Sequence, residues 1–288
     1  MHFTKCGIFA WGIPQILLTI SLTFSILYVY VSALMAGKIR EKENNTMAFD
    51  KLIFEDHFDG DTINRDIWNF EIGFIRNHEP QYYTDRPCNA YVEDSMLHIV
   101  TLREDYEGAK YTSASLNTEH NFSCTYGRIE MRAKLPWSKS LWPAFWTLGE
   151  NISVIDWPHC GEIDIMESTV NSNPDSNGEM RCTLHFQTKS TDEHNCITGD
   201  YKLPSGEKLA DDFHIYAVEW EEKECRFYFD DKCIVTHAIT EDMKQCFHRP
   251  HFILVNTALS DWNDDERPND VDTVLPQHYI IDYIRVYQ

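Results

Sequence analysis

Apolar and polar residues alternate with a period of two over much of the chain. Between positions 128 and 135, charged side chains take every second place and apolar side chains take the places between them. This period puts successive side chains on opposite faces of a β-strand, whereas a helix that faces a core repeats every 3.6 residues. Similar short runs lie at 97–101, 213–220, 226–229, 234–237, 252–256 and 279–287. Many short strands predict an all-β sandwich or jelly roll.

Signals for helices and turns are few. Thr240 followed by two acidic residues is typical of a helix start, which predicts one short helix over about 241–247. Asp230-Asp231 stands between two strand runs and predicts a hairpin turn. We therefore expect strands joined by turns, with one short helix.

The composition indicates a folded and strongly acidic protein. The chain has 288 residues, of which 43% are hydrophobic, and a formal net charge of −21 at pH 7. Because a polyanion repels other polyanions, nucleic acid and anionic membrane surfaces are poor partners, whereas an uncharged sugar is compatible. Residues 38–49 read as a polar linker with no second linker after it, so we expect one domain over 50–288, and a monomer.

The N-terminal segment differs from the rest. No charged residue occurs between Cys6 and Gly37, and positions 16–35 are rich in Leu, Ile, Val, Phe and Tyr. About 20 apolar residues cross a bilayer as a helix, whereas a cleaved signal peptide has an apolar part of about 7–15. We favour an uncleaved signal anchor over 1–37, with a cleaved signal peptide as the alternative. Basic residues between positions 38 and 42 argue for a cytosolic domain instead.

Two features outweigh those basic residues and favour the secretory pathway. Only Cys6 of the nine cysteines precedes the apolar segment, and the even number that remains suits disulfide bonds. Asn44, Asn121 and Asn151 each begin an Asn-X-Ser/Thr glycosylation site. We expect a domain in the lumen or outside the cell, membrane-anchored or secreted.

The strongest chemical signal is an acidic segment that contains Glu162, Asp164 and Glu167. As a helix it would turn Glu162 away from the other two, because successive residues rotate by about 100°. As a strand, Glu162 and Asp164 share one face and two isoleucines take the other. A regular strand would place Glu167 on the isoleucine face. A β-bulge, one extra residue before Glu167, would return it to the face of the other carboxylates.

Three carboxylates on one face repel one another and raise at least one pKa. Such an arrangement suits glycoside hydrolysis, in which one carboxylate is an ionised nucleophile and another a protonated acid. Two alternatives stay open from this pattern alone. One is a solvent-exposed polar strand face, and the other is an oxygen-rich site for Ca²⁺ or Mn²⁺.

Tryptophans precede the acidic segment. On a strand, Trp142, Ala144 and Trp146 point the same way. Flat indoles fit the apolar C–H faces of sugars, and the indole N–H can donate to a hydroxyl. A single Trp is more often a core residue, but this pair, with Trp262 in a polar loop, gives candidate walls for a sugar-binding groove.

With these residues identified, the chain resembles glycoside hydrolase family 16 over nearly all of residues 52–288, in particular its laminarinase-like endo-β-1,3-glucanases. Positions 162–167 match the E-x-D-x-x-E signature of the bulged branch of that family. Further segments resemble the family in the expected order: Phe54-Glu55-Asp56-His57-Phe58, Gln81-Tyr82-Tyr83-Thr84, Gly127-Arg128-Ile129-Glu130, Trp142-Pro143-Ala144-Phe145-Trp146 and Asp282-Tyr283-Ile284-Arg285-Val286-Tyr287.

The resemblance implies a concanavalin-like β-jelly-roll sandwich whose concave sheet forms the glycan cleft. It implies Glu162 as the nucleophile, Glu167 as the general acid/base and Asp164 as the residue that orients Glu162. It also implies that the chemistry requires no cofactor.

Other residues match family positions around the cleft. The resemblance implies that Trp142 and Trp146 stack on the sugar, that His185 lies near the acid/base, and that Asn77 binds the sugar. Asp282 matches one ligand of a structural Ca²⁺ ion on the convex face.

One segment departs from the family pattern. Where laminarinases read Tyr-Thr-Ser-Gly-Arg, this chain reads Tyr111-Thr112-Ser113-Ala114-Ser115. An arginine that contacts a glycone-side glucose is therefore replaced by Ser115, which affects the expected affinity and linkage preference.

The leading hypothesis is a retaining endo-glycosidase that hydrolyses internal β-1,3, or mixed β-1,3-1,4, glucosidic bonds of a polysaccharide. A non-catalytic β-glucan-binding receptor of the same fold lacks the catalytic acids, and both glutamates are present here. A transglycosylase would share the catalytic residues and differ only in its acceptor.

Overall fold

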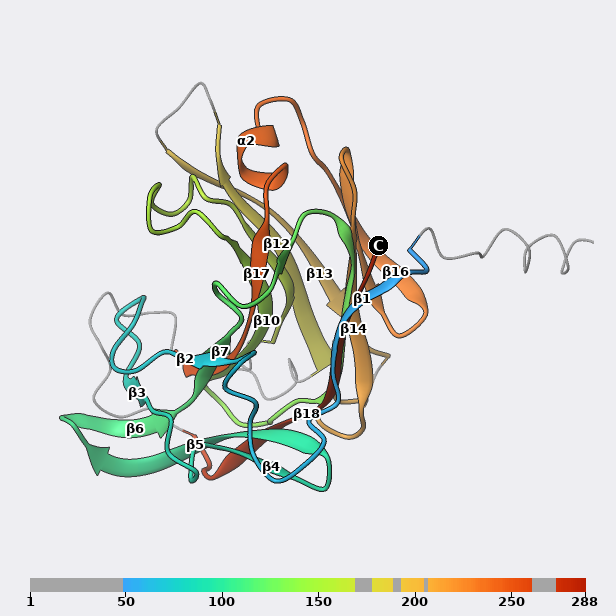
Figure 1. Ribbon diagram of the computed structural model, residues 1–288. Coiled ribbons are helices and arrows are strands. Elements are labelled where there is room, and N and C mark those ends of the chain that lie inside the picture. Colours follow the sequence, from blue (N-terminus) through green and yellow to red (C-terminus); the bar gives the residue numbers. More distant parts are fainter. Residues whose placement is uncertain (1–48, 169–177, 189–192, 205–206, 261–272) are drawn as a thin grey trace, which may run out of the picture. The chain divides into compact units, whose positions relative to one another are not determined.

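The computed structural model describes residues 49–168, 178–188, 193–204, 207–260 and 273–288. Within them the fold is two β-sheets and one short helix, so the predicted β-sandwich of the jelly-roll kind is confirmed (Figure 1). The predicted signal anchor, Asn44 and all of the predicted linker except residue 49 lie outside the described residues. The described part of the chain contains no helix that is long and apolar enough to cross a membrane.

The larger sheet has ten strands. They are β1 (Leu52–Asp56), β3 (Gln81–Tyr83), β4 (Ala90–Glu93), β5 (Met96–Tyr106), β6 (Ala109–Ser113), β9 (Gly127–Lys134), β14 (His214–Trp220), β15 (Glu224–Phe229), β16 (Lys232–Ala238) and β18 (Gln277–Tyr287). Their order is β16-β15-β14-β9-β18-β5-β6-β3, with β1 beside β18 and β4 beside β5. The pairing of β3 with β6 is parallel, and the other pairings of this sheet are antiparallel.

The second sheet has eight strands, and it contains the acidic segment. They are β2 (Asn69–Phe70), β7 (Ser115–Asn117), β8 (Ser123–Cys124), β10 (Leu141–Gly149), β11 (Glu162–Glu167), β12 (Glu179–Gln187), β13 (His194–Lys202) and β17 (His251–Leu259). Their order is β13-β12-β11-β10-β17-β7-β2, with β8 beside β17. The acidic strand β11 is therefore held by hydrogen bonds on both edges.

One hydrophobic core joins the two sheets. It includes Ile129 of β9 and Ile253 of β17, and also Ile163, Ile165 and Met166 of β11, all 0% exposed. Burial of each such side chain stabilises the fold by about 1.5–3 kcal/mol. Since β11 turns its apolar side chains into this core, its acidic side chains point to the opposite face of the sheet.

The local predictions for turns and helix are confirmed in part. Asp230-Asp231 forms the turn between β15 and β16, with Asp230 in the left-handed region at φ 51°. The helix is shorter than predicted, because α2 covers only Lys244–Phe247. Met243 N donates to Thr240 O at 3.0 Å, so the first part of the predicted helix is a sequence of turns.

The predicted disulfide bonds are absent from the described residues, where all eight cysteines are free. Several sulfurs face backbone carbonyls instead of a second sulfur. Cys182 Sγ donates to Ile165 O at 3.3 Å, and Cys246 Sγ donates to His159 O at 3.4 Å. The even number of cysteines was therefore no indication of pairing in this fold.

Candidate active site

A β-bulge interrupts the acidic strand at the predicted place. Asp164 of β11 pairs with Thr183 of β12, and Glu167 pairs with Arg181, so three steps along β11 match two along β12. The pairing with β10 shifts at the same place. One extra residue therefore lies between Asp164 and Glu167, as predicted.

The bulge brings all three carboxylates to one face of the sheet. Residues that pair directly across two antiparallel strands project to the same side. In β10 the three partners sit at alternate positions, which share a face. They are Leu148 for Glu162, Trp146 for Asp164 and Ala144 for Glu167.

Each glutamate accepts a hydrogen bond from a different tryptophan. Trp157 Nε1 donates to Glu162 Oε2 at 2.8 Å, and Trp142 Nε1 donates to Glu167 Oε1 at 2.9 Å. Trp142 lies on β10 and was predicted as a site residue from its place on that strand. Trp157 lies in the loop between β10 and β11, and no pattern in the sequence predicted it. These indoles fix the direction of both carboxylates.

Asp164 lies between the glutamates and His185. Its side chain hydrogen-bonds Glu162, and its Oδ2 lies 3.2 Å from His185 Nε2. That oxygen has no hydrogen bond of good geometry within the described residues, although Asp164 is only 3% exposed. Glu162 pairs with His185 across β11 and β12, so His185 lies beside Glu162 and Asp164. Its expected role near the acid/base Glu167 stays a prediction.

Burial raises the pKa of every member of this triad. The pKa of Glu162 rises to about 8 through burial and then repulsion from Asp164. The pKa of Glu167 rises to about 7 through burial and then repulsion from Glu162. Burial and the charge of Glu167 raise the pKa of Asp164 well above its ordinary value. At neutral pH the triad therefore keeps protons, as acid catalysis by a carboxyl group requires.

Trp146 connects the acidic strand to Asn77 through a row of hydrogen bonds. Its Nε1 donates to Asn256 Oδ1 at 2.8 Å, and Asn256 Nδ2 donates to Tyr83 Oη at 3.0 Å. Glu79 then accepts hydrogen bonds from Tyr83 at 3.3 Å and from Asn77 at 3.2 Å. Trp146 is only 7% exposed, whereas Asn77 is exposed.

A guanidinium lies beside Ser115, the position where the sequence departs from the laminarinases. Ser115 Oγ donates to Glu71 Oε2 at 2.5 Å, and Arg76 pairs with the other oxygen of Glu71. The guanidinium carbon of Arg76 lies 5.0 Å from the centre of the Trp146 ring. Its Nη1 is buried and has no hydrogen-bond partner among the described residues. An arginine is thus present near the cleft, but it comes from a loop before β3.

The sequence profile of the glycosyl hydrolases family 16 matches residues 80–285 of the chain. The chain belongs to this family.

Proteins similar to this chain include glucanases. Glucan endo-1,3-beta-glucosidase A1 of Niallia circulans is 32% identical over 263 residues, which are 82% of this chain and 38% of that enzyme. The beta-glucanase of Rhodothermus marinus is 33% identical over 251 residues, 83% of this chain and 85% of the relative. This chain thus spans less than half of one relative and most of the other.

The fold agrees with solved family 16 structures. A LamA variant from Zobellia galactanivorans in complex with laminaritriose and laminaritetraose superposes with a TM-score of 0.72 at 29% identity. The match covers 84% of this chain and 100% of the other.

The calcium ligand expected from family 16 has a different partner. Asp282 Oδ2 accepts from Arg132 Nη1 at 2.5 Å. A guanidinium at this distance neutralises the carboxylate and repels a cation, so the arrangement does not fit a calcium ion held by Asp282. Within the described residues, the groups of His, Cys, Asp and Glu that could hold one ion do not include Asp282. The calcium ion stays an untested prediction.

Trp262, the other predicted wall of the groove, lies outside the described residues.

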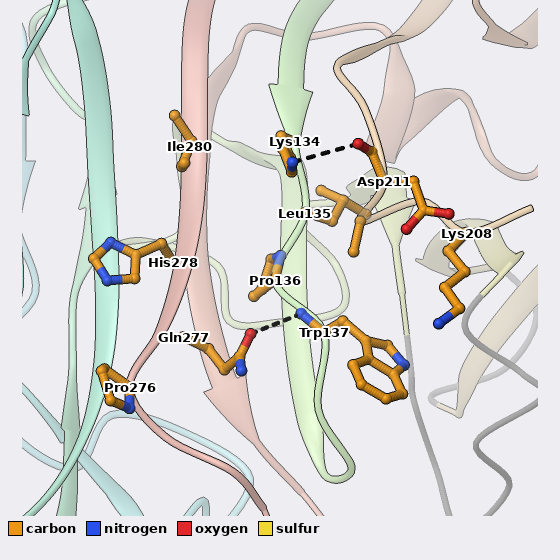
Figure 2. Close-up of a pocket in the computed structure, with 11 residues that line it drawn as sticks. Lys134, Leu135, Pro136, Trp137, Lys208, Asp211, Pro276, Gln277, His278 and Ile280 are labelled. Carbon is orange, nitrogen blue, oxygen red and sulfur yellow. Dashed lines mark hydrogen bonds between the residues drawn. The ribbon is translucent and has the colours of Figure 1, made fainter.

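A shallow cavity of about 440 Å³ lies apart from the triad, where β9 ends and β18 begins (Figure 2). There Trp137 N donates to Gln277 Oε1 at 3.1 Å and Lys134 Nζ donates to Asp211 O at 3.3 Å. Asp211 is its one acidic lining residue, so this cavity offers no pair of carboxylates for glycoside hydrolysis.

Proposed function

We propose that this chain is a retaining endo-glycosidase that hydrolyses internal β-1,3, or mixed β-1,3-1,4, glucosidic bonds of a polysaccharide. The observation that carries the proposal is the bulge in β11, which places Glu162 and Glu167 on one face of the sheet. The glucanase names of the relatives support the substrate class. The net charge of −21 is compatible with a neutral polysaccharide.

The first step forms a covalent intermediate. Protonated Glu167 donates its proton to the glycosidic oxygen while the Glu162 carboxylate attacks the anomeric carbon. The carbon–oxygen bond to the leaving sugar breaks, and an ester between the glycone and Glu162 forms. Burial and Asp164 raise the pKa of Glu162 to about 8, so the attack proceeds from the fraction of molecules in which Glu162 is ionised, and the hydrogen bond from Trp157 increases that fraction.

The second step releases the product. Glu167, now ionised, takes a proton from a water molecule, and this water attacks the anomeric carbon. The ester to Glu162 breaks, so the product has the same anomeric configuration as the substrate. Burial keeps the pKa of Glu167 at about 7, which suits a group that gives and takes a proton near neutral pH.

The test is release of reducing sugar from laminarin, lichenan and agarose by the full-length chain and by Glu162→Gln and Glu167→Gln. We expect activity on laminarin, and a loss of about 10²–10⁴-fold in Glu167→Gln with a leaving group that needs protonation. Undiminished activity of Glu162→Gln would refute the nucleophile.

The same assay separates the other candidate functions. Laminarin binding without release of reducing ends indicates a β-glucan receptor. Products longer than the substrate, measured by mass spectrometry, indicate transglycosylation.

We further propose that residues 1–37 direct a monomeric, glycosylated domain into the secretory pathway, as a membrane anchor or a cleaved signal. Asn121 is exposed, which supports it as a glycan acceptor, whereas Asn151 is partly buried. Protease protection in microsomes, with and without glycosidase treatment, tests topology and glycosylation together. Digestion of the domain in intact microsomes would contradict a lumenal location. Light scattering of the purified chain tests the monomer.

A further inference from the structure

Three metal-binding side chains converge beside the acidic strand. The donor atoms of His185, His194 and Cys196 all lie within 4.8 Å of one another. His185 on β12 pairs directly with Cys196 on β13, and His194 is two residues before Cys196. All three therefore project from the same face of the sheet, in the direct and diagonal positions of one cross-strand pair. Glycoside hydrolysis as proposed above uses neither His194 nor Cys196.

The two histidines face each other through ring nitrogens. His185 Nδ1 lies 2.7 Å from His194 Nε2, and the ring centres are 5.0 Å apart. A neutral imidazole has one donor and one acceptor nitrogen, so the two rings share one hydrogen bond at this distance. A zinc ion that replaces the shared proton moves the two nitrogens apart to about 3.3 Å, since Zn–N bonds are about 2.0–2.1 Å long and the site is tetrahedral.

Asp164 supplies the outer partner that metal-bound histidines generally have. A ligating histidine usually donates its second ring N–H to a carboxylate, which fixes the ring. His185 Nε2 lies 3.2 Å from Asp164 Oδ2, the buried oxygen without a hydrogen-bond partner among the described residues. If Nε2 carries the proton, Nδ1 presents its lone pair to His194 and Cys196.

We propose that His185 Nδ1, His194 Nε2 and Cys196 Sγ bind one Zn²⁺ ion, with water in the fourth tetrahedral position. Zinc sites with an open position have three such protein ligands, and imidazole with thiolate selects zinc over calcium or magnesium. His194 and Cys196 are exposed, so an ion reaches them from solvent. Trp157 lies beside both histidines, with its ring centre 4.5 Å from that of His194 and 5.9 Å from that of His185.

The ion inhibits hydrolysis reversibly. His185 lies next to Asp164, and Asp164 hydrogen-bonds Glu162. A metal ion bound to His185 therefore adds positive charge close to both carboxylates. A carboxylate attracted to a nearby cation is a weaker nucleophile. The binding does not depend on the proposed hydrolysis, but the inhibition does.

The binding test is titration of the full-length, reduced chain with Co²⁺ alone, followed by competition with Zn²⁺. We expect one equivalent to produce a thiolate-to-cobalt charge-transfer band, which Zn²⁺ abolishes. Cys196→Ser loses the band, and Cys196→Ser and His194→Gln each weaken Zn²⁺ binding by more than about tenfold, since even loss of an outer partner costs about 10- to 100-fold.

The control is Cys233→Ser, which removes another exposed thiol, on β16 of the other sheet. This variant keeps both the band and the affinity. A band that survives in Cys196→Ser, or that Cys233→Ser removes equally, overturns the site.

A second readout is inhibition of laminarin hydrolysis by Zn²⁺. EDTA reverses this inhibition, and the Cys196→Ser variant is not inhibited. Binding without inhibition would refute the coupling to Glu162 and leave the metal site standing. A chain inactive in every condition but with the cobalt band would refute the proposed function alone.

Discussion

The indole donors of Trp142 and Trp157 set the protonation of the two glutamates. A hydrogen bond from an N–H group stabilises an ionised carboxylate and so lowers its pKa, against the larger effect of burial. Glu167 must be protonated and Glu162 ionised, although the pKa of Glu162, about 8, lies above that of Glu167, about 7. The active form therefore carries one proton of this coupled pair, and activity falls as the pH drops below about 7 and as it rises above about 8.

We predict opposite consequences of two Trp→Phe changes for kcat/KM against pH. Trp142→Phe removes a donor to Glu167, which raises the lower pKa of the pair and moves the acid limb to higher pH. Trp157→Phe removes a donor to Glu162, which raises the higher pKa of the pair and moves the alkaline limb to higher pH. The profile of kcat/KM reports groups of the free enzyme. Movement of the same limb in both variants would contradict the assigned roles.

Arg76 gives a prediction about affinity. Its Nη1 lacks a hydrogen-bond partner among the described residues, and its guanidinium lies over Trp146, so a sugar hydroxyl is a suitable acceptor. A hydrogen bond from a charged donor contributes about 1.5–3 kcal/mol, or roughly tenfold or more in binding. Arg76→Ala should raise KM for laminarin by at least about tenfold, with a smaller effect on kcat, and Ser115→Arg should recover part of the loss.

The control for this change is Arg65→Ala. Arg65 is exposed, pairs with Asp85 and stacks on Phe70, so it shares the ion pair and ring contact of Arg76 without its position near the triad. Arg65→Ala should leave KM unchanged. An unchanged KM in Arg76→Ala would show that the guanidinium only balances the charge of Glu71.

Some residues of the site could be predicted from the sequence and others could not, for a physical reason. The bulge could be predicted, because the isoleucines of β11 demand the core face and a regular strand would then bury Glu167. Trp157 and Arg76 could not be predicted, since both come from loops whose path depends on tertiary contacts. Asn77 and His185 were found only through the resemblance to a family.

At the scale of elements, the ten-stranded sheet carries a buried ion network that the period of two does not reveal. Alternation leaves Arg128 on the polar face of β9, yet this side chain is only 8% exposed. Glu219 of β14 accepts from Arg128 at 3.2 Å, from Arg226 at 3.1 Å and from Tyr228 at 2.7 Å. Strand order decides which charges become neighbours, and a single strand pattern does not contain that order.

We predict that Glu219→Ala destabilises the fold by about 1–3 kcal/mol, because Arg128 loses one buried acceptor and keeps Glu130, which accepts from it at 2.9 Å. Urea unfolding followed by intrinsic fluorescence measures the change. Glu221→Ala is the matched control: Glu221 is a partly exposed partner of Arg226, with 42% of its side chain exposed, so its removal should cost less than about 1 kcal/mol. Equal losses of stability in the two variants would show that the burial of Arg128 does not increase the cost of removing Glu219.

At the scale of the whole molecule, the all-β class could be predicted, but the order of strands could not. The period of two is local, whereas β9 pairs with β14 and β18, which follow much later in the chain. The cysteine count also misled, because the core of this fold takes up thiols as small apolar groups.

The free thiols give a prediction for the folded chain. Cys88, Cys196 and Cys233 are exposed, and the remaining described cysteines are buried: Cys124, Cys160, Cys182, Cys225 and Cys246. Alkylation of the native protein without reductant should label the exposed three, and unfolding should add the buried five. Peptide mapping by mass spectrometry identifies each label. A pair that stays unlabelled after unfolding until a reductant is added would contradict the free thiols.

The anomeric configuration of the first product tests the central claim most directly, namely that Glu162 and Glu167 act from one bulged strand by double displacement. Proton NMR follows a laminari-oligosaccharide from the first turnover, before the new reducing end equilibrates. We predict that the β-anomer appears first and the α-anomer grows in later, since two displacements retain configuration. Initial release of the α-anomer would mean a single displacement by water, which contradicts Glu162 as the nucleophile.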